Sequence, residues 1–546
     1  MSTTSEQAPD ASIAAPTELS AEESGRMSHS EIVKALVGML MAMMTAFLSS
    51  TIVSIALPTI ITELRGSQSQ YTWIVTATLL ASTASTPIWG KLADLFDKKL
   101  LIQIAITIFT LGSIAAGLSQ STEVLIVWRV IQGLGLGGLQ ALVVIAIAAM
   151  VSPRERGKYM GPVAAIMSVA TVAGPLLGGL IVDTSWLGWQ WCFFAGVPLA
   201  VAALIVVQRT LHLPVIKRPV NIDYLGAGLI ASGVSALLIW VTLGGNQFAW
   251  NSTTSWAVAG IGVALLALAI IVEARAKDPI IPLRLFRDRT TVLATVASIA
   301  VGTAMFGGAV FLGQYFQIAR GYSPTESGLL TLPMVIGSMI TSSGSGWLIT
   351  RFGRWKIFLV SGSAFMVAGF ALLGSIDHET NMVLIGTYLF VLGVGMGMLM
   401  QNLVLAVQNS VAPSDLGSSS STVAFFRSLG GTVGVSVLGA VLATRVGNLI
   451  SDGLAAIGID VADAPGGEEV GIGQLDELPA PLADIVRAAY GDGTATIFLI
   501  AAAVAAVSFL VVLFIKEVPL RTQSGMEAQL AEARATEVDR PKAVVG

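Results

Sequence analysis

The segment that decides the fold is Gly90-Lys91-Leu92-Ala93-Asp94-Leu95-Phe96-Asp97-Lys98-Lys99, because a related segment returns 256 positions later as Gly346-Trp347-Leu348-Ile349-Thr350-Arg351-Phe352-Gly353-Arg354-Trp355. Both contain Gly-x-Leu, a Phe at the same offset and basic residues at the end. Each lies between long apolar stretches. A duplicated membrane domain with matching hairpins is the architecture of secondary transporters. The sequence therefore predicts two related helical halves.

The composition is typical of a protein that lies largely in a membrane. Of 546 residues, 54% are hydrophobic and 12% are charged, against about 25% charged residues in soluble domains. The mean hydropathy is +0.78, and so few polar residues could not cover a soluble surface of this size. We therefore expect an all-α polytopic membrane protein in contact with the lipid bilayer.

Several classes of function lack the residues they need. Cys192 is the single cysteine, so no internal disulfide and no cysteine metal cluster are expected. The three histidines lie outside the apolar runs, and no phosphate-binding Gly-x-x-x-x-Gly-Lys-Ser/Thr loop is present. We expect no cofactor, no metal, no nucleic-acid partner and no enzymatic activity, since a membrane enzyme needs a clustered nucleophile, base or metal ligands.

Fourteen apolar runs of about 20 residues are separated by polar breaks, and each could cross about 30 Å of hydrocarbon. With both termini in the cytoplasm, seventeen Lys and Arg residues fall in inner loops and four in outer loops, which matches the positive-inside rule. The runs lie near residues 33–57, 71–90, 100–119, 124–148, 160–182, 191–210, 224–243, 255–273, 291–313, 327–349, 357–375, 383–408, 419–443 and 494–515.

The repeat sets the division of the chain. The duplicated loop joins the second and third runs and again the tenth and eleventh, and Gly133-x-Gly135-x-Gly137 returns as Gly393-x-Gly395-x-Gly397. This predicts two six-helix bundles separated by two central helices. The predicted parts are a disordered cytoplasmic tail at 1–30, an N-terminal bundle at 31–211, a central two-helix insert at 212–275, a C-terminal bundle at 276–515 with an outer loop at 444–493, and a cytoplasmic tail at 516–546 that reads as disordered from 521.

The basic, amphipathic segment 276–289 is expected to lie along the inner membrane surface. Four further segments carry a family resemblance. They are the loop at 90–99, Arg129-Val130-Ile131-Gln132-Gly133 and the glycines after it, Ala173-Gly174-Pro175-Leu176-Leu177-Gly178-Gly179, and the stretch from Leu48 to Pro58.

With these segments the chain resembles a major facilitator superfamily transporter of the fourteen-spanner drug:proton antiporter family (EmrB/QacA type), over about residues 30 to 515. The resemblance implies two six-helix bundles plus two central helices. It also implies proton-coupled export of hydrophobic or amphipathic drugs across the inner (plasma) membrane. The expected partners are small-molecule substrates and protons, and a monomer is expected.

The resemblance assigns a cytoplasmic gate to the duplicated loop, with Asp94 set against a neighbouring helix end. A carboxylate at a helix N-terminus is favoured by the helix dipole, whereas positive-inside anchoring alone would explain the lysines but not Asp94. The gate residues are Gly90, Asp94, Lys98, Lys99, Arg351 and Arg354.

Two further segments would carry coupling and export. By resemblance Arg129 takes part in proton coupling; the alternative is a structural arginine that pairs with backbone carbonyls. Gly174, Pro175, Gly178 and Gly179 match the antiporter motif, where Pro bends the helix and Gly leaves a flat face for close packing.

The first apolar run departs from the family pattern, because Ser49 stands where the family has Asp and Ser54 where it has Asn. Hydroxyls in this run would line a polar path for substrate or would bond back to their own helix carbonyls. Three glutamines complete the candidate path, although placement at the membrane interface explains Gln314 and Gln317 equally well. The candidates are Ser49, Ser50, Thr51, Gln132, Gln314 and Gln317.

The apolar runs hold few carboxylates, and Asp183 and Glu326, at run ends, are the candidate proton carriers. Arg427 either snorkels to the interface or pairs with Asp415. An alternative function is a dedicated exporter of one metabolite, siderophore or lipid, with an anionic cargo compatible with Ser49. A non-transporting membrane sensor is the alternative of another class.

Overall fold

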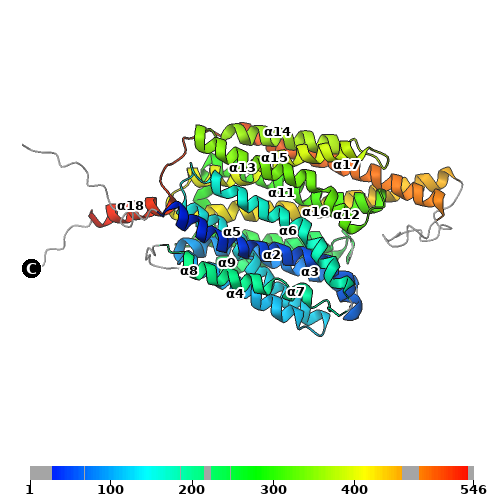
Figure 1. Cartoon of the computed structure of the whole chain (residues 1–546), viewed down its shortest axis with the longest axis horizontal. Coiled ribbons are helices and arrows are strands. Elements are labelled where there is room, and N and C mark those ends of the chain that lie inside the picture. Colours follow the sequence, from blue (N-terminus) through cyan, green and yellow to red (C-terminus); the bar gives the residue numbers. More distant parts are fainter. Residues whose placement is uncertain are drawn as a thin grey trace, which may run out of the picture.

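The computed structural model describes residues 27–66, 68–184, 186–213, 223–245, 247–457 and 479–538. Long helices run side by side along one direction of the molecule (Figure 1). The first set comprises α2 (His29–Glu63), α3 (Gln68–Leu95), α4 (Lys98–Gly117), α5 (Thr122–Met150), α6 (Gly157–Asp183), α7 (Trp191–Phe194) and α8 (Val197–Thr210).

The second set comprises α11 (Arg289–Gln314), the π-helix η2 (Tyr315–Ala319), α12 (Pro324–Leu330), α13 (Leu332–Phe352), α14 (Lys356–Leu373), α15 (Met382–Ser410), α16 (Leu416–Ala456) and α17 (Ala480–Leu513). Between the sets lie α9 (Tyr224–Leu243), α10 (Thr253–Glu273) and the 3-10 helix η1 (Leu283–Arg287). The 3-10 helix η3 (Pro413–Asp415) precedes α16, and α18 (Gly525–Val538) is the last described helix.

Polar residues set the helix ends in the manner their chemistry predicts. Ser28 and Glu31 form a capping box at the start of α2, and the side chain of Asp97 accepts a hydrogen bond from the backbone N–H of Lys99 at the start of α4. Gly353 ends α13 with a φ of 72°, a left-handed conformation that glycine adopts without steric cost. Each copy of the duplicated loop thus has one defined helix end, the start of α4 in the first and the end of α13 in the second.

Eleven helices in the described part of the chain are long and apolar enough to cross a membrane. The predicted all-α architecture is confirmed, whereas the predicted number of fourteen spans is not. The runs predicted near 71–90, 160–182 and 327–349 lie in α3, α6 and α13, which are helical but are not among the eleven. Repeated Ser and Thr residues lower the hydropathy of α3 and α13.

The glycine triplets occupy matching places in the two sets, which makes the internal repeat visible in space. Each glycine lies so close to a neighbouring backbone that a Cβ would collide with it: Gly133 lies on Thr78, Gly135 on Phe109 and Gly137 on Ser82, while Gly393 lies on Met334, Gly395 on Met366 and Gly397 on Ser338. The contacted residues of α3 and α13 are again 256 positions apart. The two halves therefore pack by the same register.

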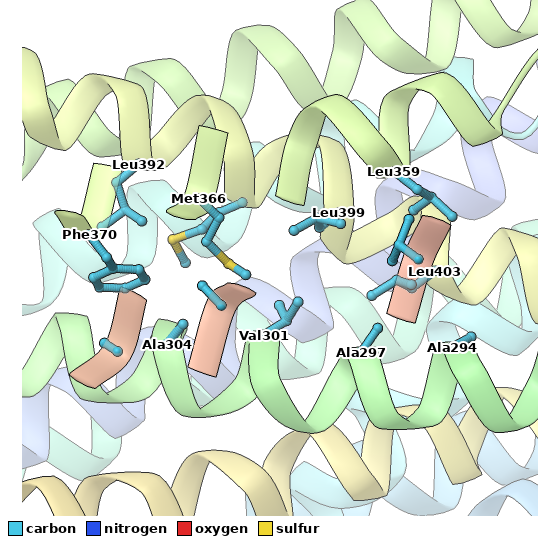
Figure 2. Packing of buried hydrophobic residues seen from close by; sticks show 14 of the residues in the cluster. Ala294, Ala297, Val301, Ala304, Leu359, Met366, Phe370, Leu392, Leu399 and Leu403 are labelled. Atoms are coloured by element: carbon cyan, nitrogen blue, oxygen red, sulfur yellow. The ribbon is translucent and has the colours of Figure 1, made fainter. Parts of the chain in front are cut away.

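The second set packs around an apolar core of its own. Ala294, Ala297, Val301 and Ala304 form a stripe of small side chains along α11, at spacings of three and four residues that place them on one face. Larger side chains from α14 and α15 lie opposite this stripe, among them Leu359, Met366, Phe370, Leu392, Leu399 and Leu403 (Figure 2). Small side chains on one helix let the others approach closely.

The two sets touch chiefly through four helices, α3, α6, α13 and α16. α3 packs against α16, and α6 packs against α13, while α9 packs against both α3 and α16. The turns between α3 and α4 and between α13 and α14 lie at the end of the molecule that carries α18 (Figure 1), and we call this the α18 end. Three of these four contact helices are the ones that fall outside the eleven apolar spans. Each of these three helices buries one face against the other set, and a face in contact with protein needs less hydrophobic surface than one in contact with lipid.

The outer segment predicted at 444–493 is helical at both of its ends. α16 continues to Ala456 and α17 begins at Ala480, and the two extensions pack together through Val446, Ile450 and Ala489. Residues 458–478 lie outside the described chain. The first polar residues after an apolar run were expected to end the helix. They mark instead the point where the helix leaves the hydrocarbon, because a helix in water does not need apolar residues.

The tail predicted to be disordered from residue 521 is also wrong for its first part, since α18 packs against α5 and η3. Gln529 donates a hydrogen bond to the carbonyl of Pro413 at 2.6 Å, and Ser524 and Met526 are buried. Within the tail predicted at 1–30, α2 already begins at His29. Residues 1–26 and 539–546 lie outside the described chain.

The segment 276–289, expected along the inner membrane surface, is held against helix ends. The backbone N–H groups of Ile280 and Ile281 donate to Glu273 at 3.1 and 3.0 Å. Arg284 pairs with Asp415 at 2.8 Å. This pairing replaces the one considered between Asp415 and Arg427.

Candidate transport site

A cavity of about 380 Å³ lies between the two sets of helices. Its lining comes from α2, α3 and α5 of the first set, from α9, and from α11 and α16 of the second. Apolar side chains such as Leu79, Leu136 and Phe306 alternate with hydroxyls such as Thr76 and Thr432. A cavity of this volume and composition suits an amphipathic small molecule.

The three hydroxyl side chains of α2 that were predicted to line a substrate path have different surroundings. Ser50 lines the cavity. Ser49 is not among the residues of the lining and is buried, with only 2% of its surface exposed. The hydroxyl of Thr51 donates to carbonyls of its own helix, at Phe47 and Leu48, and lies 3.1 Å from the carbonyl of Ala170 on α6. One of the three therefore faces the candidate substrate space.

Arg129 and Gln132 form a buried polar network inside the first set. The guanidinium of Arg129 donates to the carbonyl of Ile74 at 3.2 Å and to the side-chain oxygen of Gln132 at 2.5 Å. Gln132 in turn donates to the hydroxyls of Ser113 at 2.7 Å and Ser49 at 3.4 Å. The described residues place no carboxylate in this network, so the charge of Arg129 is stabilised by neutral oxygen atoms.

The antiporter motif lies on α6 with Gly174 against α2. A Cβ at Gly174 would collide with the side chain of Thr51, whereas a Cβ at Gly179 would meet nothing within 4 Å. Gly178 is buried, and Pro175 lies within the same helix. Gly174 thus permits close packing of α2 and α6, the helix that also meets the second set.

At the α18 end, Asp94 joins the two sets. Its carboxylate accepts hydrogen bonds from the backbone N–H groups of Gly417 and Ser418, at 2.7 and 2.8 Å, and from the hydroxyl of Ser418 at 2.7 Å. These donors are the first residues of α16, where the helix dipole favours a negative charge. Gly90, one turn earlier, lies against Gly417 and Ser421. Asp94 and Gly90 therefore form one contact across the two halves.

The repeated loop makes a matching contact without a carboxylate. Gly346 lies directly against Gly157 of α6, so closely that neither position could carry a Cβ without a shift. Thr350 stands where the first loop has Asp94; its hydroxyl donates to its own helix, and its carbonyl accepts from Arg154 at 3.4 Å. The contact of α3 with α16 at Gly90 and the contact of α13 with α6 at Gly346 are thus related in position. The first has the stronger polar contact, because it includes the carboxylate of Asp94.

Three of the predicted basic gate residues, Lys99, Arg351 and Arg354, have different surroundings. Lys99 donates to the carbonyl of Gln208 at 2.7 Å, and Lys98 begins α4. Arg351 stacks on the rings of Trp347 and Phe352 on its own helix. Arg354 is exposed. Of the predicted gate residues, Asp94 and Gly90 contact α16.

Glu326 is not among the described residues that line the cavity. Glu326 belongs to a capping box at the start of α12, where the backbone N–H and hydroxyl of Ser323 donate to its carboxylate and hold its pKa below the ordinary value. Asp183 is the last residue of α6. Gln314 and Gln317, at the junction of α11 and η2, are half-buried and absent from the lining of the cavity.

Two residues of this region were not predicted. Arg156 is buried and donates to the side chain of Gln408 on α15 and to the carbonyls of Ala148 and Val151. Lys91 is buried, with its ammonium 4.0 Å from Asp278. The sequence counts both among loop cations, and no local pattern separates them from exposed ones such as Arg154. Among the described residues, no three His, Cys, Asp or Glu side chains are grouped closely enough to hold a metal ion.

Two related sets of helices with a cavity between them, and with contacts that join them at one end, define a membrane transporter. Residues 39–435 match the model of the Major Facilitator Superfamily. The chain therefore belongs to the major facilitator superfamily; it is a polytopic membrane transporter of small molecules and not an enzyme.

Named relatives and a solved structure agree with this membership. The chain is 38% identical to an MFS-type transporter of Mycobacterium tuberculosis over 484 residues, which cover 87% of this chain and 68% of that protein. It is 36% identical to the multidrug transporter protein MdtP of Bacillus subtilis over 422 residues, or 77% of each chain. The proton:xylose symporter XylE has a similar fold, with a TM-score of 0.60 and 15% identity over 92% of this chain and 100% of that chain.

Proposed function

We propose that this chain is a proton-coupled efflux transporter that exports hydrophobic or amphipathic drugs across the cytoplasmic membrane. It would belong to the fourteen-spanner drug:proton antiporter type, act as a monomer and keep both termini in the cytoplasm. The observation that carries the proposal is the 380 Å³ cavity between the two sets, with apolar walls and scattered hydroxyls. The printed name of the relative MdtP supports multidrug transport.

Alternating access would use the contacts at the α18 end as a gate. α3 and α16 line the cavity through residues 75–83 and 428–436, and they meet at Gly90, Asp94 and Gly417 beyond it. Separation of this contact would open the cavity toward the α18 end, which the positive-inside rule makes the cytoplasmic end. Gly157 and Gly346 would separate in the same movement.

We propose that proton coupling involves the polar network of Arg129 in the first set of helices. Arg129 is stabilised only by neutral oxygen atoms among the described residues, so a nearby change of charge would act strongly on its contacts with Ile74 and Gln132. Asp183 and Glu326 are the carboxylates proposed to exchange the proton. Because Glu326 caps α12, Asp183 is the first to test.

The antiporter motif supports export. Gly174 brings α6 against Thr51 of α2, and α6 also carries Gly157, which meets α13. A movement of α6 during opening would therefore also move α2, which lines the cavity at Ser50.

The test is transport by the purified full-length chain in proteoliposomes. A pH gradient of either sign is imposed, and a cationic, a neutral and an anionic amphipathic dye are offered in turn. We expect uphill dye movement that reverses with the gradient and stops when a protonophore removes it. Asp183→Asn and Glu326→Gln are compared in the same assay. Movement that ignores the gradient in both directions would contradict proton coupling, and no movement of any dye would contradict efflux.

A further inference from the structure

A second, smaller cavity of about 40 Å³ lies next to the large one and contains a charge. Phe47 and Gln140 line both cavities, so the two spaces adjoin across these side chains. The small cavity is also lined by Arg427 of α16, with Gln401 of α15 and Ser420 of α16 beside it. The two cavities together form one site with an apolar part and a polar part.

The same face of α16 runs along both spaces. The small cavity takes Ser420, Ala424 and Arg427, and the large one takes Ser428, Gly431, Thr432, Val435 and Ser436. Their spacings of three, four and one residues place them on one stripe of a helix. The small cavity therefore lies between the large one and the contact of Asp94 with the start of α16.

Arg427 is a cation without a protein partner in the described part of the chain. Its guanidinium forms no hydrogen bond and no ion pair there, in contrast to Arg129, which is held by Ile74 and Gln132, and Arg156, which is held by Gln408. The described linings of the two cavities include no Asp or Glu. A cation at membrane depth is expensive unless it faces a cavity or a partner.

We propose that the transported substrates are amphipathic monoanions, whose carboxylate or sulfonate group binds Arg427 while an aromatic or alkyl body fills the large cavity. The guanidinium presents a planar fork of donors that matches such oxyanions. Gln140, Gln401 and Ser420 offer further donors around it. The volume of the large cavity suits a body of the size of a fused aromatic ring pair and does not enclose a diacyl lipid. This inference rests on the proposed efflux function and specifies its substrates.

The test compares two probes that differ by one sulfonate, anilinonaphthalene sulfonate and neutral N-phenylnaphthylamine. Binding is measured by fluorescence with the full-length chain in phosphatidylcholine nanodiscs, with naphthalene sulfonate as competitor to isolate the specific site. We expect Arg427→Gln to weaken binding of the anion about tenfold, as for a lost charged hydrogen bond, and to leave the neutral probe within about twofold. Arg427→Lys should recover part of the loss. Arg445→Gln, an exposed arginine of the same helix, is the control and should change neither probe.

A second variant guards against misfolding of the first. Gln140→Glu places a carboxylate in both cavities, so it should weaken the anion and leave the neutral probe unchanged. Equal effects on both probes, or no preference of the unaltered chain for the anion, would overturn the inference. Loss of anion binding when phosphatidylglycerol is added to the nanodiscs would also overturn it, because the occupant would then be a lipid headgroup. If the proteoliposomes export neutral or cationic dyes and Arg427→Gln does not change the binding of the anionic probe, the inference alone fails. If no dye moves, the proposed function fails.

Discussion

Asp94 accepts two hydrogen bonds from Ser418, from the backbone N–H at 2.8 Å and from the hydroxyl at 2.7 Å, although 324 positions separate the two residues. One belongs to the last turn of α3 and the other to the first turn of α16. This contact joins the two sets at the α18 end. Its neighbours, the paired glycines, set how closely the helices approach there.

Asp94→Asn should weaken the closed arrangement of the α18 end. The amide keeps one acceptor oxygen and loses the negative charge at the start of α16, a change of about 2 kcal/mol in favour of the open state, or about thirtyfold. The measurement is the distance between spin labels on Phe96 and Arg354 in a Cys192→Ala background, which should lengthen. Asp97→Asn, which alters only the cap of α4, is the control, and an equal lengthening in it would contradict the gate.

Gly346→Ala should impair transport, whereas Gly344→Ala should not. The first methyl group would press on the backbone of Gly157, and the second would meet nothing within 4 Å. Overpacking of this kind costs about 1–3 kcal/mol, while Ala in a helix gains about 1 kcal/mol over Gly. Transport rate and melting temperature are measured for both. Matching behaviour of the two variants would mean that the Gly157–Gly346 contact has no role.

Arg129→Ala should abolish efflux while the protein still inserts and folds. The change leaves the carbonyl of Ile74 and the amide of Gln132 without their donor, at a cost of about 1–3 kcal/mol for each unsatisfied group. Drug export is measured with protein amount in the membrane and melting temperature. Arg209→Ala, an exposed arginine in the last turn of α8, should stay active. Continued export by Arg129→Ala would remove this residue from the coupling machinery.

Ser50→Asp should widen the acceptance of cationic dyes more than Ser49→Asp. A carboxylate at position 50 enters the cavity directly, where it would attract a cation in a weakly screening environment. A carboxylate at position 49 would instead meet Gln132 and the nearby Arg129. Dye accumulation in cells that express each variant is the measurement. An unchanged dye profile in both would count against α2 as part of the substrate path.

Several features of the structure follow from the sequence with little ambiguity. The helical class and the internal repeat were predicted from hydropathy and from spaced glycines, because lipid allows only helices at this composition and close packing needs glycine. The glycine repeat can be recognised in the sequence because equivalent helices of the two halves pack closely in the same way. The helix ends beyond the apolar runs, in α16, α17 and α18, were missed, since polar helices outside the bilayer have no such periodic signal.

By itself, the sequence determined that the chain is a helical membrane protein built as two related halves, since hydropathy and repeat spacing are local properties of the chain. The tertiary structure alone decided which polar groups act together. It showed that Asp94 reaches Ser418 and that Ser50 faces the cavity while Ser49 does not. It also showed that Arg156 finds a partner on the other half whereas Arg427 finds none in the described chain. Hydrogen bonds and burial depend on residues hundreds of positions apart, and their distances arise only when the helices pack.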